Sequence, residues 1–162
     1  MRQTNLTLDG MKAGVRDSTV FILILTERVL ASWFCQQEIL TAIEEQKKIQ
    51  LIIEQEERFH PFDVAAWQKQ ADDGKETREV VNQHGKTVEV EPKICKMIDD
   101  HLQDAVPYRR RDFEQEAMMR ALCERNGVSL PQLPCGVSDG WGPDKEPVVV
   151  YVICNMASAS EV

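Results

Sequence analysis

The sequence lacks long hydrophobic runs and any excess of positive charge, and each shortage excludes a class of protein. Its longest apolar runs are Phe21–Leu25 and Val148–Cys154, far short of the roughly 20 residues that a membrane-spanning helix needs. Residues Met1–Thr7 contain no apolar stretch of the kind found in signal peptides. The net charge of −8 argues against a nucleic-acid surface, because binding phosphates requires clustered Lys and Arg. We therefore expect a cytoplasmic protein with no membrane span and no nucleic-acid partner.

Metal-binding and disulfide patterns are also missing. The five cysteines are odd in number and widely spaced, and no Cys-x-x-Cys occurs among them: Cys35, Cys95, Cys123, Cys135 and Cys154. The three histidines are equally scattered and form no His-Glu-x-x-His motif. This pattern favours reduced, mostly buried thiols over a disulfide or zinc framework. The sequence predicts no metal site.

What the chain does contain is a clear alternation of strand and helix. Its 162 residues are 43 % hydrophobic, which is enough to form the core of one domain. The apolar run Thr19–Thr26 predicts a strand buried on both faces, which is typical of parallel sheets. An amphipathic helix is predicted from about Ser32 to Lys47, and Ile49–Ile53 predicts a second buried strand. Together they form a predicted βαβ unit, for which a right-handed crossover is expected.

The remaining segments show mixed signals. Apolar spacing predicts three further helices, over residues 6–17, Val64–Gln70 and Lys93–Asp104, the last of which Pro107 ends. A fourth helix is predicted to begin at Asp112, where Gln115 completes a capping box. Gly127 stands where the C-terminal cap of this helix is expected. Two short β-rich runs flank Asn82–Gly85, which indicates either a hairpin or a mobile excursion. Residues 129–147 have the composition of a linker. The strand-like Val148–Cys154 that follows has no obvious partner, so it is interpreted either as a strand that fills an edge of the sheet or as the first strand of a further domain.

Four features follow one another through residues 5–67: Gly14–Ser18, the hydrophobic strand ending at Thr26, the segment Ser32–Ile39 and the strand Ile49–Ile53. In this order they resemble the C-terminal half of a Toll/interleukin-1 receptor (TIR) domain. Within Ser32–Ile39, Cys35 and Glu38 keep the Cys-x-x-Glu spacing of the family, Ile39 takes its Leu position and Phe34 its Trp position, with Trp33 one residue earlier. Gln46–Trp67 and Tyr108–Arg120 also resemble TIR-like proteins of unicellular eukaryotes.

The resemblance implies an α/β, flavodoxin-like fold, in which a parallel sheet carries helices on both faces. The first strand-helix-strand of the family does not precede residue 5, so the resemblance implies an incomplete sheet. It divides the chain into a partial TIR domain over 5–127, a Pro/Gly-rich linker over 128–147 and a strand-like tail over 148–162. We then expect the strand at Thr19–Thr26 to lack its neighbour and to present an exposed apolar edge that favours aggregation or pairing with another chain.

The resemblance also implies a chemistry. Many TIR domains cleave NAD⁺ between nicotinamide and ribose, and the glutamate of the Cys-x-x-Glu motif is the residue associated with this cleavage. Glu38 is therefore the candidate catalytic residue, and Trp33, Phe34 and Cys35 are the candidate substrate-binding residues. NAD⁺ would be the substrate, with no cofactor and no metal. A carboxylate near the ribose can stabilise the oxocarbenium character that develops as nicotinamide leaves.

Structural interpretations of these residues stay open beside the catalytic one. Glu38 is also explained as a first-turn acid that stabilises a helix N-terminus, and Cys35 as a small buried hydrophobe. The triplet Arg109–Arg111 indicates either an anion site or pairing with nearby acids, for which the candidates are Asp99, Asp100 and Asp104. The aromatic residues after the second strand are expected to cap the core, with a partner-binding patch as the alternative: Phe59, Phe62 and Trp67.

Three functions remain open from the sequence. The first is a signal-transduction enzyme, an NAD⁺ nucleosidase that hydrolyses its substrate through Glu38. The second is a non-catalytic module that assembles with TIR-domain proteins or with itself through its helices and loops. The third is an inactive partial domain.

Overall fold

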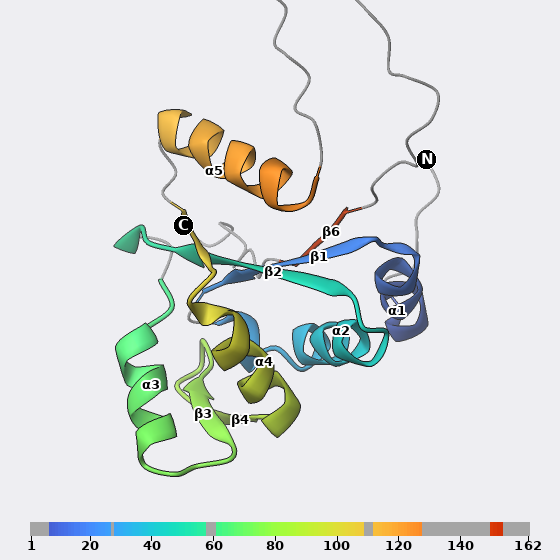
Figure 1. The fold of residues 1–162 in the computed structure, drawn as a ribbon. Coiled ribbons are helices and arrows are strands. Elements are labelled where there is room, and N and C mark those ends of the chain that lie inside the picture. Colours follow the sequence, from blue (N-terminus) through green and yellow to red (C-terminus); the bar gives the residue numbers. More distant parts are fainter. Residues whose placement is uncertain (1–6, 27, 58–60, 109–111, 128–149, 154–162) are drawn as a thin grey trace, which may run out of the picture.

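The computed structural model of the chain describes residues 7–26, 28–57, 61–108, 112–127 and 150–153. A four-stranded sheet in the order β5-β2-β1-β6 organises the fold (Figure 1). Its strands are β1 (Val20–Leu25), β2 (Lys48–Glu54), β5 (Val106–Tyr108) and β6 (Val150–Ile153). All three neighbouring pairs are parallel. With helices on both faces of this parallel sheet, the structure confirms the predicted α/β, flavodoxin-like class of fold.

The central strand β1 is buried on both faces, as its uninterrupted apolar run predicts. Because side chains alternate along a strand, Phe21, Leu23 and Leu25 enter one core of the protein. Val20 and Ile22 enter a second core on the opposite face. The sheet therefore separates two hydrophobic cores, and β1 contributes to both.

The larger core lies on the face that carries most of the helices (Figure 1). It is covered by α1 (Leu8–Asp17), α2 (Trp33–Glu44), α3 (Val64–Asp72), α4 (Pro92–Leu102), the short 3₁₀ helix η1 (Val29–Ala31) and the antiparallel hairpin of β3 (Arg78–Val81) and β4 (Thr87–Val90). The hairpin confirms one of the two interpretations of the segment around Asn82–Gly85. Among the described helices, none has the length and apolar character that crossing a membrane requires.

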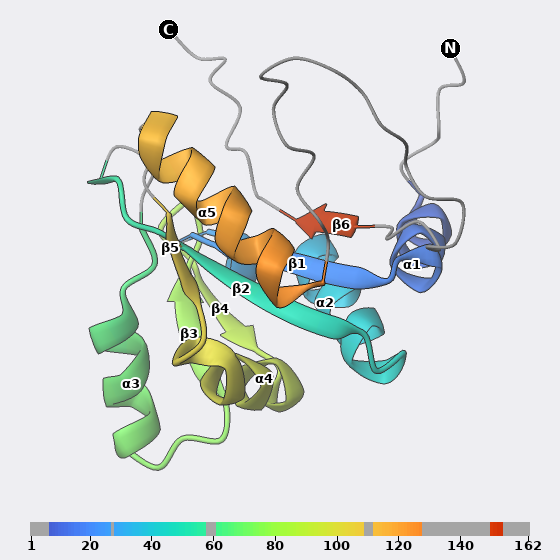
Figure 2. The ribbon, with the colours of Figure 1, turned by 45° about the horizontal axis from the view of Figure 1, so that its top comes forward.

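The opposite face is covered by α5 (Asp112–Arg125), which lies across the side of the sheet formed by β2 and β5 (Figure 2). Leu122 is its buried anchor and packs in the smaller core with Val20, Ile52 and Val106. Gly127 follows the helix with a φ of 66°, which is the left-handed conformation that glycine favours after a helix end. This confirms the predicted C-terminal cap.

The structure departs from the sequence expectations at two places. The helix predicted over Lys93–Asp104 does end before Pro107, at Leu102, but Pro107 itself lies inside the strand β5, where it pairs with Ile53 of β2. Proline is tolerated there because β5 is an edge strand. The strand β1 does not lack a neighbour on its second side, since β6 pairs with it from Val20↔Val150 to Leu23↔Ile153. The strand-like run near the C-terminus thus has a partner, and within the described part of the chain β6 is the edge strand on this side of the sheet.

Several expectations fall outside the described residues. The structure says nothing of the linker residues 129–147, of Arg109–Arg111 or of Phe59. The other two predicted core-capping aromatics are described and are buried: Phe62 is 8 % exposed and Trp67 is 2 % exposed. Their ring centroids lie 5.3 Å apart, so these two residues do cap the core.

Candidate functional site

The candidate site lies where β1 ends and α2 begins, at the carboxyl edge of the sheet. Ser32 caps α2 by accepting a hydrogen bond from the Cys35 N–H at 3.4 Å. The buried Gln36 side chain then fixes the start of the helix, because its amide donates to Leu30 O at 2.8 Å and to Glu89 O at 3.1 Å. The first turn of α2 is thereby attached to both η1 and the β3–β4 hairpin.

Glu38 lies in the second turn of this helix and is buried, with 6 % of its surface exposed. The first turn contains no acidic residue, so the interpretation of Glu38 as a first-turn acid is wrong. Helix-dipole stabilisation falls off within that first turn and does not account for Glu38. A buried carboxylate instead needs partners that compensate its lost hydration, and Glu38 does interact with other groups of the protein.

The three residues expected to surround Glu38 differ in their exposure. Trp33 is 56 % exposed and Phe34 is 49 % exposed. Their rings meet edge to face with centroids 5.1 Å apart. Cys35 is half-buried and forms no disulfide within the described part of the chain. Phe34 and Cys35 precede Glu38 by four and three residues, so all three share one side of α2. The structure brings Trp33 and Phe34 together at the surface but does not enclose them with Glu38.

Two polar residues at the same edge of the sheet escaped the sequence analysis as site candidates. Glu54, at the end of β2, is 0 % exposed, and its Oε1 accepts a hydrogen bond from the Glu56 N–H at 3.1 Å. Thr26, directly after β1, is 8 % exposed, and its hydroxyl has no hydrogen-bond partner within the described part of the chain. An acidic residue directly after the apolar run Ile49–Ile53 was the available signal for Glu54.

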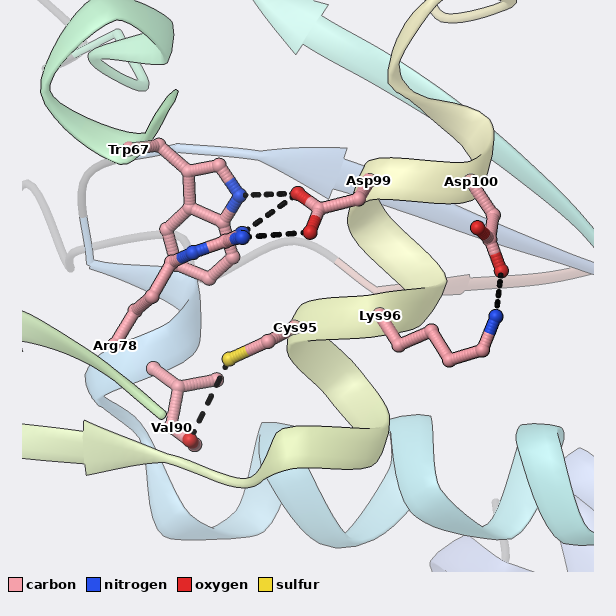
Figure 3. Close-up of polar contacts among 7 residues, drawn as sticks. All are labelled: Trp67, Arg78, Val90, Cys95, Lys96, Asp99 and Asp100. Atoms are coloured by element: carbon pink, nitrogen blue, oxygen red, sulfur yellow. Dashed lines mark hydrogen bonds and ion pairs between the residues drawn. The ribbon is translucent and has the colours of Figure 1, made fainter. Parts of the chain in front are cut away.

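The best-defined polar cluster lies elsewhere, between α3, β3 and α4 (Figure 3). Arg78 forms two parallel hydrogen bonds of 2.6 Å from its Nη1 and Nη2 to the two carboxylate oxygens of Asp99. The indole N–H of Trp67 donates to the same Asp99 at 3.0 Å. The guanidinium carbon of Arg78 lies 4.5 Å from the Trp67 ring centroid, a cation–π distance.

The charges of this cluster stabilise one another. The hydrogen bonds with Asp99 raise the pKa of Arg78 further, against the opposing effect of burial. Burial alone would raise the pKa of Asp99, but the hydrogen bonds from Arg78 and Trp67 and the positive charge of Arg78 together lower it. Burial is also the main cause that raises the pKa of the nearby Cys95 thiol. Because its polar groups face each other, the cluster joins α3 and the hairpin to α4 rather than forming a reactive site.

A pocket of about 320 Å³ is open on another side of the molecule. It lies beside the amino-terminal half of β2 and the ends of α4 and α5, and is lined by Ile49, Gln50, Leu51, His101, Asp104 and Arg125. None of these residues was predicted to belong to a site. Ligands of open α/β sheets bind at the carboxyl ends of the strands, so we give more weight to the edge that carries Glu38 than to this pocket.

The described residues contain no group of three or more His, Cys, Asp or Glu side chains that could hold a metal ion. Comparisons of the chain with known protein families, curated proteins and solved structures found no match.

Proposed function

We propose that the chain is a TIR-type signalling module in which Glu38 supports cleavage of NAD⁺ between nicotinamide and ribose. The observation that carries the proposal is the burial of the Glu38 carboxylate, with 6 % of the residue exposed, in the helix that follows the central parallel strand. Burial of a carboxylate costs free energy unless partners compensate it, and buried acids in this position are candidates for a functional role.

The order of the strands supports this location. The chain passes from β1 to β2 and β5 on one side, and then returns to place β6 on the other side of β1. In open α/β sheets, ligands bind outside the carboxyl ends of the strands where the order changes direction in this way. Here that point lies at β1, and α2 with Glu38 is the helix that follows β1.

The proposed reaction is a hydrolysis. The bond between the ribose anomeric carbon and the nicotinamide nitrogen breaks, and nicotinamide leaves as a neutral molecule with the bonding electron pair. Water adds to the anomeric carbon and releases one proton, giving ADP-ribose. The ionised carboxylate of Glu38 would stabilise the positive charge that develops on the ribose and orient its hydroxyl groups. Trp33, Phe34 and Cys35 would contact the substrate. The Thr26 hydroxyl, which has no hydrogen-bond partner among the described residues, is a further polar group at this edge.

The proposal is tested by NAD⁺ turnover of the purified chain and of Glu38→Gln, which keeps the size of the side chain and removes its charge. We expect turnover to fall by about 10²–10³-fold, the usual cost of losing one group that stabilises transition-state charge. The matched control is Glu44→Gln on the exposed side of the same helix, which should retain the wild-type rate. Background-level loss of NAD⁺ in all three folded proteins would refute the catalytic proposal.

A non-catalytic interaction module is the alternative that one observation favours. Trp33 and Phe34 expose large aromatic side chains next to each other at the start of α2, and adjacent exposed aromatics are typical of protein-binding surfaces. On this alternative, the module binds TIR-domain proteins or itself. A folded chain that leaves NAD⁺ intact, and whose association requires Trp33 and Phe34, would favour the alternative over the enzyme.

A further inference from the structure

The outer edge of β6 is open in the described structure. β6 is the last strand of the sheet and pairs on its inner side with β1. Among the described residues, no strand pairs with its outer side. In a strand, alternate N–H and C=O groups point away from the existing partner. This edge therefore presents unpaired backbone groups that can add another strand.

The two edges of the sheet differ in how they are protected. The opposite edge strand, β5, is three residues long and contains Pro107, which lacks the N–H that an added strand would need. β6 has the sequence Val-Tyr-Val-Ile, with no proline and no charge. In the sequence, the uncharged run continues from Val148 to Ser160. β6 therefore lacks the charged residues and prolines that commonly prevent edge-to-edge pairing.

An apolar side chain lies at the same edge. Val152 is 52 % exposed. The register Ile22↔Val152 places it on the sheet face that α5 partly covers. On that face Ile24 of β1 is also only partly buried. An additional strand at β6 would thus cover apolar surface while it satisfies backbone groups.

We propose that β6 pairs with β6 of a second copy of this chain, antiparallel, and joins the two four-stranded sheets into one continuous sheet. A second copy presents the identical unprotected edge, and a two-fold axis normal to the sheet brings two such edges together antiparallel. All the residues opposed in this arrangement are uncharged. Elsewhere, two copies that each carry a net charge of −8 repel each other.

The size of the contact and the charge of the chain determine how the dimer behaves. An edge of four residues contributes far less than the roughly 1,200–2,000 Å² that stable interfaces bury. The dimer is therefore weak and forms as the protein concentration rises. Because salt screens the repulsion between the two acidic chains, association strengthens with ionic strength.

The test is sedimentation equilibrium of the full chain over a wide concentration range, with the variant Val152→Lys. This variant places two positive charges close together across the two-fold axis, and we expect it to raise the dimer dissociation constant about tenfold or more. The matched control is Val81→Lys, which adds the same charge at a strand valine of similar exposure, 49 %, in the hairpin. Its dissociation constant should stay at the wild-type value. A wild-type chain that remains monomeric throughout, or an equal effect of the two variants, would overturn the proposal.

A second measurement keeps the proposal testable if Val152→Lys does not fold. Amide hydrogen exchange of the wild-type residues 150–153 should slow at high protein concentration, because the outward N–H groups are then paired. Exchange that does not depend on concentration would contradict β6 pairing. Neither measurement involves NAD⁺, so the dimer proposal and the catalytic proposal can fail separately. Association that depends on Trp33 and Phe34, and not on Val152, would favour the surface on α2 instead.

Discussion

Asp99 is the residue whose ionisation matters most for the packing of α4. It accepts hydrogen bonds from Arg78 and Trp67, and Arg78 is only 4 % exposed. Loss of the carboxylate charge would leave a buried guanidinium with a weakened partner, which is destabilising. The carboxylate itself is 41 % exposed, so solvent screens part of this interaction.

The lowered pKa of Asp99 predicts how stability depends on pH. Burial raises the pKa of Asp99, but the hydrogen bonds from Arg78 and Trp67 and the charge of Arg78 together outweigh burial. The pKa of folded Asp99 therefore lies below its ordinary value of about 3.9. The stabilisation is therefore fully present above that value and is lost as pH falls through the folded pKa. We expect the difference in free energy of unfolding between wild type and Asp99→Asn to be constant at neutral pH and to shrink below about pH 4. Urea unfolding at a series of pH values measures it.

The neighbouring Asp100 supplies the control. Its exposed carboxylate pairs with Lys96 one turn away on the same helix, at 3.0 Å. Asp100→Asn should stay within about 0.5 kcal/mol of wild type. If Asp100→Asn and Asp99→Asn lost the same stability with the same pH dependence, the special role of Asp99 would be refuted.

Single residues also show what a local motif can and cannot indicate. The resemblance singled out Glu38 through its Cys-x-x-Glu spacing with Cys35, which can be read without the fold, and its catalytic role stays a prediction. The partners of Asp99 could not be found in this way, because Arg78 and Trp67 are 21 and 32 residues away in the chain. Sequence proximity suggested Arg109–Arg111 instead, whereas the structure pairs Asp99 with Arg78.

At the scale of the element, the β3–β4 hairpin depends on its turn. Asn82 Oδ1 accepts hydrogen bonds from the N–H groups of His84 and Lys86, at 2.9 and 3.0 Å. Gly85 has a φ of 71°, a left-handed conformation that costs other residues about 1–2 kcal/mol. Apart from Gly85 itself and its two neighbours in the chain, no described atom lies within 4 Å of where a Cβ would be, so a substitution at Gly85 is penalised by backbone strain rather than by a clash.

This turn gives a prediction with an internal control. We expect Gly85→Val to lower the free energy of unfolding by about 1–2 kcal/mol. Gly85→Asn should cost clearly less, because Asn adopts left-handed conformations more readily. Urea unfolding of the two variants measures the difference. Equal losses would show that the left-handed backbone is not the source of the penalty.

The boundaries of the elements show the limits of pattern reasoning. The buried strands and amphipathic helices were predicted within a few residues, because hydrophobic periodicity is local. β5 was missed because it has only three residues and contains Pro107. Its strand conformation comes from pairing with Ile52–Glu54 of β2, which no local pattern in residues 106–108 indicates.

At the scale of the whole molecule, the two faces of the sheet have unequal support. One core is shared by several helices, whereas the other is covered by α5, whose buried anchor is Leu122, 5 % exposed. Truncation of Leu122 removes packing that joins α5 to three strands, since it lies in one cluster with Val20, Ile52 and Val106. The attachment of α5 to the sheet should therefore be sensitive to this single side chain.

We expect Leu122→Ala to lower the free energy of unfolding by about 2–4 kcal/mol, as large-to-small substitutions in cores do. Met119→Ala on the same helix is the control, because Met119 is 49 % exposed and should change stability by less than about 0.5 kcal/mol. Urea unfolding followed by circular dichroism compares them. Similar effects of both variants would show that α5 does not depend on the Leu122 contact.

The class of fold and the central βαβ unit could be predicted from the sequence, because each follows from residues close together in the chain. The partner of β6, the burial of Glu38 and Glu54, and the pairing of Arg78 with Asp99 emerge only from the folded chain. These features depend on contacts between segments far apart in the chain, and hydrophobic periodicity shows which face of an element is buried but not which element covers it. For that reason the edge expected at β1 lies, among the described residues, at β6.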